Sequence, residues 1–319
     1  MTEIAESEAA ARPTAARGVS RPGRMRSRRT RRSWTSSPYT YVALAFVYMA
    51  VFILYPMVRT IWESLTDTSL LNPSAGTFVG LANYQALLHN GTLAQSLYVT
   101  IMYVLLSVSV AMVLGVVCAM LVERVTVGRS LAKSALALPW AIPTIATGIL
   151  FTVVLDPDIG IVDHLLNETH LPSVGWLTNN TLAFFSVSAI TVWTLFPFVM
   201  LITISAMKGI PAELYDAVAV DGASAWSTFR AVTLPGIAPT LRVVTVLEVI
   251  WAFQQFQLAF VLTGGGPVNG TNFLVINLYK TAFDDKQLGM ASAIGVVGLL
   301  LASAFVVVYL LVERRARAQ

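Results

Sequence analysis

Charged residues are scarce in this chain of 319 residues. Only 12% of them are Asp, Glu, Lys or Arg, against about a quarter in soluble domains, which excludes an ordinary soluble globular domain. Cysteine is nearly absent as well. Cys118 stands alone inside an apolar run, so the chain can form no internal disulfide, and this residue is expected to be a small buried hydrophobic side chain.

Several catalytic and ligand-binding patterns are missing too. No Gly-x-x-x-x-Gly-Lys-Ser/Thr loop is present to cradle phosphates, so this chain is not expected to bind ATP itself. The histidines, His89, His164 and His170, lack the neighbouring cysteines or the helical spacing of a metal site. No Ser/His, Cys/His or carboxylate pair falls within an apolar run, which makes a membrane-embedded enzyme the least favoured function.

Long apolar runs are abundant, since 56% of the residues are hydrophobic and the mean hydropathy is +0.70. Six runs of about 22–26 residues can each cross a hydrocarbon core of about 30 Å as a helix, and they are too continuously apolar for barrel strands. We therefore predict an all-α integral membrane protein with a transmembrane domain over residues 39–312. The six predicted helices cover residues 39–61, 96–121, 131–155, 182–206, 240–261 and 288–312.

Basic residues predict the orientation of these helices. Of the 21 Lys and Arg residues, 18 fall on one side: before the first helix, after the last, or in the second and fourth connections and the first turn of the helix that follows each. Short loops rich in Lys and Arg stay in the cytoplasm, so both termini are expected there, in a multi-pass protein of the cell membrane. Residues 1–38 are predicted to be a disordered basic tail and residues 313–319 a short cytoplasmic one. Topology thus explains the net charge of +4, and no nucleic acid partner is expected.

The connection over residues 208–239 is the longest on the predicted cytoplasmic side and carries helix signals. Pro211 suits a first helical turn, Glu213 and Asp216 favour the positive end of a helix, and Gly222 suits its termination. A short helix with one apolar face is predicted, suited to a groove on a partner. An interfacial helix resting on lipid headgroups is the alternative, but the absence of basic residues argues against it.

The same connection resembles the EAA loop of ABC importer permeases. Residues 216–223 read Asp-Ala-Val-Ala-Val-Asp-Gly-Ala and are followed by Leu234 and Pro235, in the spacing of that family. Asp216 replaces the family's Glu, and Val218 replaces its second Ala.

Two further runs resemble the maltose-type carbohydrate permeases within that family. Residues 263–267 read Thr-Gly-Gly-Gly-Pro, with Thr271 four residues on, and residues 289–293 read Gly-Met-Ala-Ser-Ala. With the six predicted helices, the similarity extends over about residues 41–312.

The resemblance implies a type I ABC importer permease: six transmembrane helices with a cytoplasmic coupling helix between the fourth and fifth. It implies a second homologous permease subunit, two ATPase subunits that bind ATP and Mg²⁺, an extracytoplasmic solute-binding protein and surrounding membrane lipid. The chain itself is expected to be non-catalytic. The expected ATPase contacts are Glu213, Tyr215, Asp216, Ala217, Asp221, Gly222, Leu234 and Pro235, and the expected binding-protein contacts are Gly264, Gly265, Gly266 and Pro267.

Polar side chains in the fifth predicted helix point to a solute pathway. At about 100° per residue, Glu248, Trp251 and Gln255 share one face, which joins an aromatic ring to hydrogen-bonding groups suited to a sugar. Interhelical packing of these side chains is the open alternative. The resemblance adds three residues of the fourth helix, Thr191, Thr194 and Phe198.

The favoured function is therefore ATP-driven, binding-protein-dependent import of a carbohydrate or related polyol. An ion-coupled secondary transporter that uses Glu248 for proton coupling is one alternative, although it leaves the cytoplasmic helix unexplained. An ABC permease for a solute other than a sugar is the other. Prolines at three positions, Pro139, Pro143 and Pro197, are expected to kink the third and fourth helices.

Overall fold

The computed structural model describes residues 38–317, and every regular element in this range is a helix. The chain divides into two units, residues 1–53 and 54–319. The first contains α1 (Pro38–Met49) and most of the π-helix η2 (Ala50–Leu54), whose described side chains are exposed. The predicted basic tail lies outside the described residues apart from Pro38.

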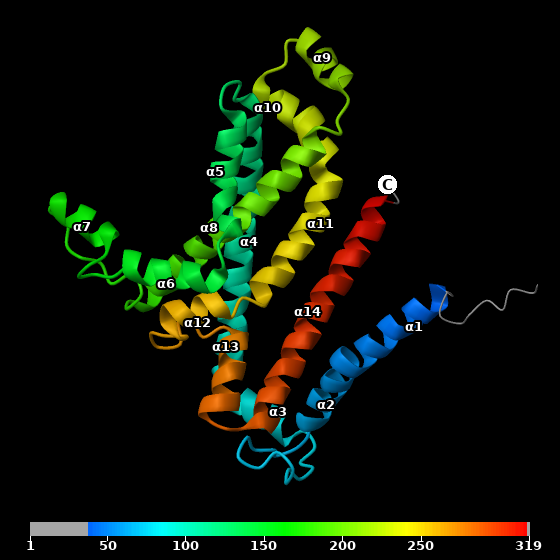
Figure 1. The fold of residues 1–319 in the computed structure, drawn as a ribbon, viewed down its shortest axis with the longest axis vertical. Coiled ribbons are helices and arrows are strands. Elements are labelled where there is room, and N and C mark those ends of the chain that lie inside the picture. The colour runs from blue at the N-terminus through cyan, green and yellow to red at the C-terminus, as the bar shows by residue number, and fades with distance from the viewer. Residues whose placement is uncertain (1–37, 318–319) are drawn as a thin grey trace, which may run out of the picture. The chain divides into compact units, whose positions relative to one another are not determined.

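The second unit carries the rest of the fold, with α9 at one end and α3 at the other, which we call the α9 end and the α3 end (Figure 1). Its elements are α2 (Tyr55–Glu63), α3 (Ala82–His89), α4 (Thr92–Arg124), α5 (Arg129–Ala141), α6 (Thr144–Val154), α7 (Ile161–Glu168), α8 (Asn180–Met207), α9 (Ala212–Val220), α10 (Ala225–Thr228), η3 (Phe229–Thr233), α11 (Leu234–Phe253), α12 (Gln257–Thr263), α13 (Leu274–Tyr279), η4 (Lys280–Asp284) and α14 (Leu288–Arg317).

The described helices confirm the all-α membrane prediction. Five are long and apolar enough to span a bilayer, and the pair α5 and α6 makes a sixth span if it is counted as one. The five are Tyr41–Glu63, Thr92–Arg124, Asn180–Met207, Ala225–Phe253 and Leu288–Leu311.

The third predicted helix is not continuous. α5 and α6 meet at an angle of 95°, and the break falls at Ile142 and Pro143. Ile142 has an extended backbone, because a proline pushes the residue before it out of the helical region, and Pro143 is the N-cap of α6. Pro143 thus forms a corner instead of a kink, whereas Pro139 lies inside α5 and Pro197 inside the unbroken α8.

The fifth predicted helix, over residues 240–261, has different limits in the structure. Helical backbone begins at Ala225 and ends at Phe253, and α12 begins again at Gln257. The helical backbone continues through the π-helix η3, which ends two residues before Pro235. The interruption at residues 254–256 divides the apolar run into two helices.

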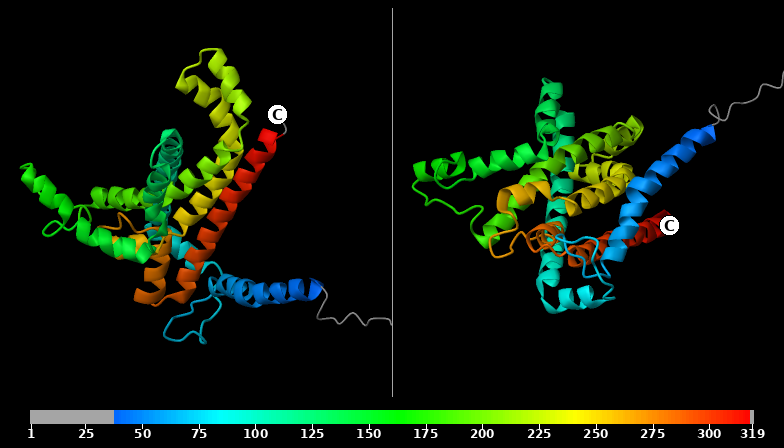
Figure 2. Two further views of the ribbon diagram at one scale, coloured as in Figure 1. Left: turned by 45° about the horizontal axis from the view of Figure 1, so that its top comes forward. Right: turned by 60° about the horizontal axis from the view of Figure 1, so that its bottom comes forward.

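The core forms where α4 and α8 lie side by side (Figures 1 and 2). Gly115 permits this approach, since a Cβ there would lie 2.5 Å from the Cβ of Val199. Nearer the α3 end, the hydroxyls of Tyr103 and Thr191 are 2.8 Å apart and both side chains are buried. The ring of Tyr103 also stacks on Phe273, with centroids 4.2 Å apart, so α4 joins α8 to the segment before α13.

The α3 end is closed by the segment over residues 64–81. The Asn83 amide donates to the carbonyls of Ser64 and Thr66 at 2.9 and 2.8 Å. Gly289, at the start of α14, donates its N–H to the carbonyl of Thr68 at 2.9 Å. A Cβ at Gly289 would lie 2.0 Å from the carbonyl oxygen of Thr66, so this contact needs glycine.

Candidate functional site

The predicted cytoplasmic helix is present as α9. Pro211 precedes its first residue with an extended backbone, and Glu213 lies in its first turn. Asp221 follows its last residue, and Gly222 has a φ of +69°, a left-handed conformation that glycine adopts without strain. The N–H groups of Gly222 and Ala223 then close the end by donating to the carbonyls of Ala219 and Val218.

α9 is held at a few points only. The hydroxyls of Tyr215 and Thr233 are 3.2 Å apart, and Thr233 is buried in η3. Ser224 caps the following α10 by accepting from the N–H of Ser227 at 3.2 Å. These contacts fix the hairpin formed by α9 and α10 without covering its outer face.

The outer face of this hairpin is acidic and apolar. None of the side chains of α9 is buried, and Val220 and Trp226 are 88% and 69% exposed. Residues 209–229 contain three acids and no lysine or arginine. Such a surface fits a partner groove that offers basic groups and an apolar floor. The acids are Glu213, Asp216 and Asp221.

The other predicted coupling residues are spread over two elements. Ala217 lies exposed on α9 beside Asp216, and Tyr215 faces η3. Leu234 and Pro235 are also exposed, but they form the first turn of α11. The structure therefore brings six of the eight predicted residues together on α9 and its C-terminal turn. The other two, Leu234 and Pro235, lie on α11, after α10 and η3.

The predicted solute residues on α8 are largely satisfied within the chain. The hydroxyl of Thr191 donates to the carbonyl of Val187 at 2.9 Å, besides its contact with Tyr103. The hydroxyl of Thr194 donates to the carbonyl of Thr191 at 2.8 Å. Thr191 is fully buried and Thr194 is partly exposed, so Thr194 is the more accessible of the two.

Aromatic rings meet where α5, α8 and α11 approach each other. The ring of Phe198 lies edge-on to Trp251, with centroids 4.9 Å apart, and is 5.8 Å from Trp140. Trp251 is 39% exposed, so this cluster presents indole surface outside the core. Such surface can stack on the CH face of a sugar ring.

The expectation that Glu248, Trp251 and Gln255 share one helical face is wrong. α11 ends at Phe253, and Gln255 lies in the break before α12. Glu248 is fully buried on the same face as Val244 and Ala252, whereas Trp251 is half-exposed. Neither carboxylate oxygen of Glu248 has a hydrogen-bond partner in the described part of the chain, which is costly at this depth.

The predicted docking residues form a turn that faces inward. Gly264 and Gly265 have φ values of 56° and 87°, and a Cβ at Gly265 would lie 2.9 Å from Ile276. The hydroxyl of Thr271 donates to the carbonyl of Gly266 at 2.7 Å and closes the turn, which ends in the cis bond before Pro267. The exposed tip is the next residue, Val268, at 83%.

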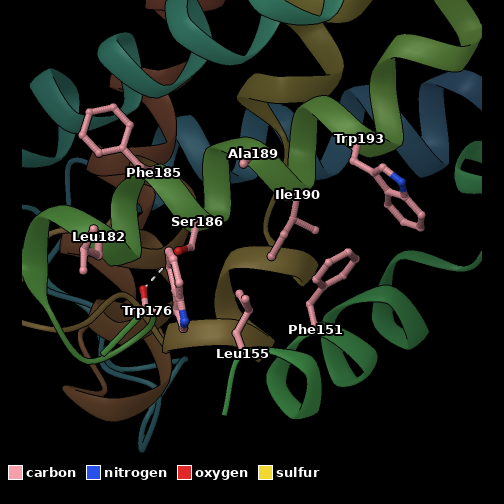
Figure 3. A pocket seen from close by; sticks show the side chains of 9 residues that line it. All are labelled: Phe151, Leu155, Trp176, Leu182, Phe185, Ser186, Ala189, Ile190 and Trp193. Atoms are coloured by element: carbon pink, nitrogen blue, oxygen red, sulfur yellow. Dashed lines mark hydrogen bonds between the residues drawn. The ribbon is translucent and has the colours of Figure 1, made fainter. Parts of the chain in front are cut away.

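Sequence reasoning missed an ordered site between α7 and α8. Asp163 is buried on α7, and its two oxygens accept from the backbone N–H of Val174 and the indole N–H of Trp176, the latter at 2.8 Å. This arrangement fixes Trp176 at the rim of a cavity of about 370 Å³ (Figure 3). Asp163 is one acidic residue in a polar loop of the sequence, so this site could not be predicted from it. The cavity is lined by Phe151, Leu155, Trp176, Leu182, Phe185, Ser186, Ala189, Ile190 and Trp193.

Comparison with known proteins places this chain in a family. Residues 111–318 match the binding-protein-dependent transport system inner membrane component family. The chain is 32% identical to the trehalose/maltose transport system permease protein MalF of Thermococcus litoralis, over 88% of this chain and 94% of the relative. It is 28% identical to the sulfoquinovosyl glycerol transport system permease protein SmoG of Agrobacterium fabrum, over 86% and 89%.

The fold also matches solved structures. A chain of a bacterial alginate ABC transporter, crystallised in complex with its alginate pentasaccharide-bound periplasmic protein, superposes with a TM-score of 0.78 at 19% identity. The match covers 87% of this chain and 94% of that one. The chain therefore belongs to the inner membrane components of binding-protein-dependent transport systems, and it is a multi-pass permease subunit.

Proposed function

We propose that this chain is one permease subunit of an ATP-driven importer for a carbohydrate or related polyol. Family membership supports the transport role, and the names of the relatives, which refer to trehalose, maltose and sulfoquinovosyl glycerol, support a carbohydrate solute. The complete importer contains a second permease subunit, two ATPase subunits and an extracytoplasmic solute-binding protein. The chain contributes half of the pathway and catalyses no reaction itself.

The observation that carries the coupling role is the exposed, acidic α9. It docks into a cleft on an ATPase subunit, which binds ATP and Mg²⁺, so closure of the ATPase moves the hairpin. Asp216 and Asp221 form charge-assisted hydrogen bonds with basic groups of that cleft. Gly222 permits the tight turn beside them, because a larger residue would be strained at its φ of +69°.

The solute passes beside the aromatic cluster of Trp251 and Phe198. The indole packs on the CH face of the sugar, and the polar groups of Thr194 and Gln255 bond its hydroxyls. Both of these residues are partly exposed, as that role requires. The hydroxyl of Thr191 contacts that of Tyr103 behind the site, and Glu248 supplies a carboxyl that has no hydrogen-bond partner among the described residues.

The orientation follows from the charge pattern. The α9 end, the basic tail of residues 1–38 and the C-terminal residues 313–319 face the cytoplasm. The α3 end faces outward. The binding protein docks on the same side of the membrane, at the turn after α12 made by Gly264, Gly265, Gly266 and Pro267, with Val268 at its exposed tip.

The test uses the co-expressed importer with Asp221→Arg and, separately, Gly222→Asp. Each variant is expected to lose ATPase association and at least tenfold of uptake at normal membrane levels, when trehalose, maltose and alginate oligosaccharides are offered. Asp158→Arg reverses an equally exposed charge in the connection between α6 and α7 and should keep the ATPase bound. Unchanged ATPase association and uptake in both α9 variants would reject the coupling role and return ion-coupled transport to consideration.

A further inference from the structure

One face of the hairpin formed by α12 and α13 consists of aromatic rings. Phe256 and Phe260 lie one helical turn apart at α12, and Tyr279 and Phe283 lie one turn apart where α13 passes into η4. The ring centroids are 4.8 Å apart for Phe256 and Phe260, 5.0 Å for Phe260 and Tyr279, and 4.8 Å for Tyr279 and Phe283. These four residues form one continuous surface, which we call the hairpin rings.

The opposite face of the hairpin already supplies its packing. Leu258, Ala259, Leu262 and Ile276 are buried in the main core. Phe256 packs partly against that core and anchors the surface. The other three rings do not belong to that core. Phe260 and Tyr279 are partly exposed, and Phe283 is 52% exposed.

Polar residues occupy the sequence positions next to the hairpin rings. Gln255 and Gln257 flank Phe256, and Lys280 and Asp284 follow Tyr279 and Phe283, all at least partly exposed. A surface that faced only lipid would avoid such groups, because burying them in hydrocarbon is costly. Rings bordered by hydrogen-bonding groups fit a pyranose, whose CH face is apolar and whose rim carries hydroxyls.

We propose that the hairpin rings, with Gln255, Gln257, Lys280 and Asp284 around them, form a second carbohydrate-binding surface. α12 and α13 lie between α11 and the α3 end of the unit (Figure 1). A sugar released at the α3 end therefore meets the hairpin rings before it reaches Trp251. The surface holds the released sugar beside the pathway and limits its escape. This inference rests on the proposed function and extends it.

The experiment uses the complete importer in proteoliposomes and measures one ratio, the amount of solute moved per ATP hydrolysed. The binding protein is loaded with trehalose, maltose or alginate oligosaccharide, whichever supports uptake. Phe260→Leu combined with Tyr279→Leu removes two rings and keeps an apolar surface. We expect the ratio to fall about tenfold, because the sugar loses its contacts with two aromatic rings. Phe260→Tyr combined with Tyr279→Phe keeps both rings and should retain the ratio.

Two further variants separate sugar binding from packing. Phe283→Leu changes the most exposed ring and should lower the ratio about threefold, even if the double variant fails to assemble. Phe78→Leu removes a ring of similar exposure, 63%, that stacks on Trp62 elsewhere at the α3 end, and should not change the ratio. A purely structural role would lower transport and ATP hydrolysis together and leave the ratio constant.

A constant ratio in Phe283→Leu and in every assembled ring variant would overturn the inference while leaving the proposed function intact. Failure of the proposed function gives a different result, in which the wild-type importer moves none of the three carbohydrates.

Discussion

Replacing Glu248 with methionine removes a buried carboxyl that has no hydrogen-bond partner among the described residues. The side chain lies one helical turn from both Val244 and Ala252 on the buried face of α11, so methionine, which is similar in length and flexible, can fill the space. An unsatisfied buried polar group costs about 1–3 kcal/mol. We expect Glu248→Met to increase the free energy of unfolding of the assembled importer by about 1–3 kcal/mol.

Denaturant unfolding of the importer in lipid nanodiscs provides the measurement. Glu248→Gln is the matched control, since it keeps the shape and still needs hydrogen-bond partners, and it should gain less than half as much. Uptake of the accepted carbohydrate is measured in parallel, because loss of uptake in the stabilised variant indicates solute contact and retained uptake indicates packing. A Glu248→Met importer less stable than the wild type would refute the reasoning, since the carboxyl must then have a partner in the complete assembly.

Two other predictions concern the α3 end. Gly289→Ala places a methyl group 2.0 Å from the carbonyl oxygen of Thr66 and should destabilise the importer by about 1–3 kcal/mol in the same unfolding assay. The Asp67 carboxylate accepts from the backbone N–H and hydroxyl of Thr77, which holds the pKa of Asp67 below its ordinary value. The stabilisation by the ionised Asp67 carboxylate is present above the unfolded pKa of about 4 and is lost as the pH falls. The rate of hydrogen exchange over residues 64–81, corrected for intrinsic rates, should therefore increase below about pH 4.

Each of these expectations has its own control. Gly295→Ala changes a glycine on the same helix whose nearest neighbour is the flexible end of Leu278 at 3.2 Å, and should be tolerated. If Gly289→Ala is equally harmless, the close approach of α14 to Thr66 is not required. Asp67→Asn should remove the acid-induced change in exchange; the same pH response in that variant would assign it to another group.

Uninterrupted apolar runs allowed the sequence to predict α4, α8 and the membrane part of α14. Each run is long enough to be recognised without knowing its neighbours. The ends of α9 were also predictable, because Pro211 and Gly222 have strong local preferences that tertiary contacts need not override. Local chemistry and hydropathy thus determined these elements.

The breaks in the third and fifth helices were not predictable from hydropathy, because the apolar character continues through both. Ile142 and Pro143 turn the chain by 95°, and the break after Phe253 depends on how α12 packs against α6 and α8. The exposed surface of the Gly264 turn could not be assigned for a similar reason, since its glycines permit close packing against Ile276. Residue type alone does not say which side of a turn faces solvent.

The helical backbone from Ala225 to Phe253 connects the acidic hairpin to the interruption at Gln254. Its 29 residues correspond to a rod about 43 Å long at about 1.5 Å per residue. A tilt of about 5° at the Ala225 end displaces the far end by about 4 Å, roughly the thickness of one sugar ring. Small rotations imposed on the hairpin are therefore amplified geometrically where Gln255 and the hairpin rings begin.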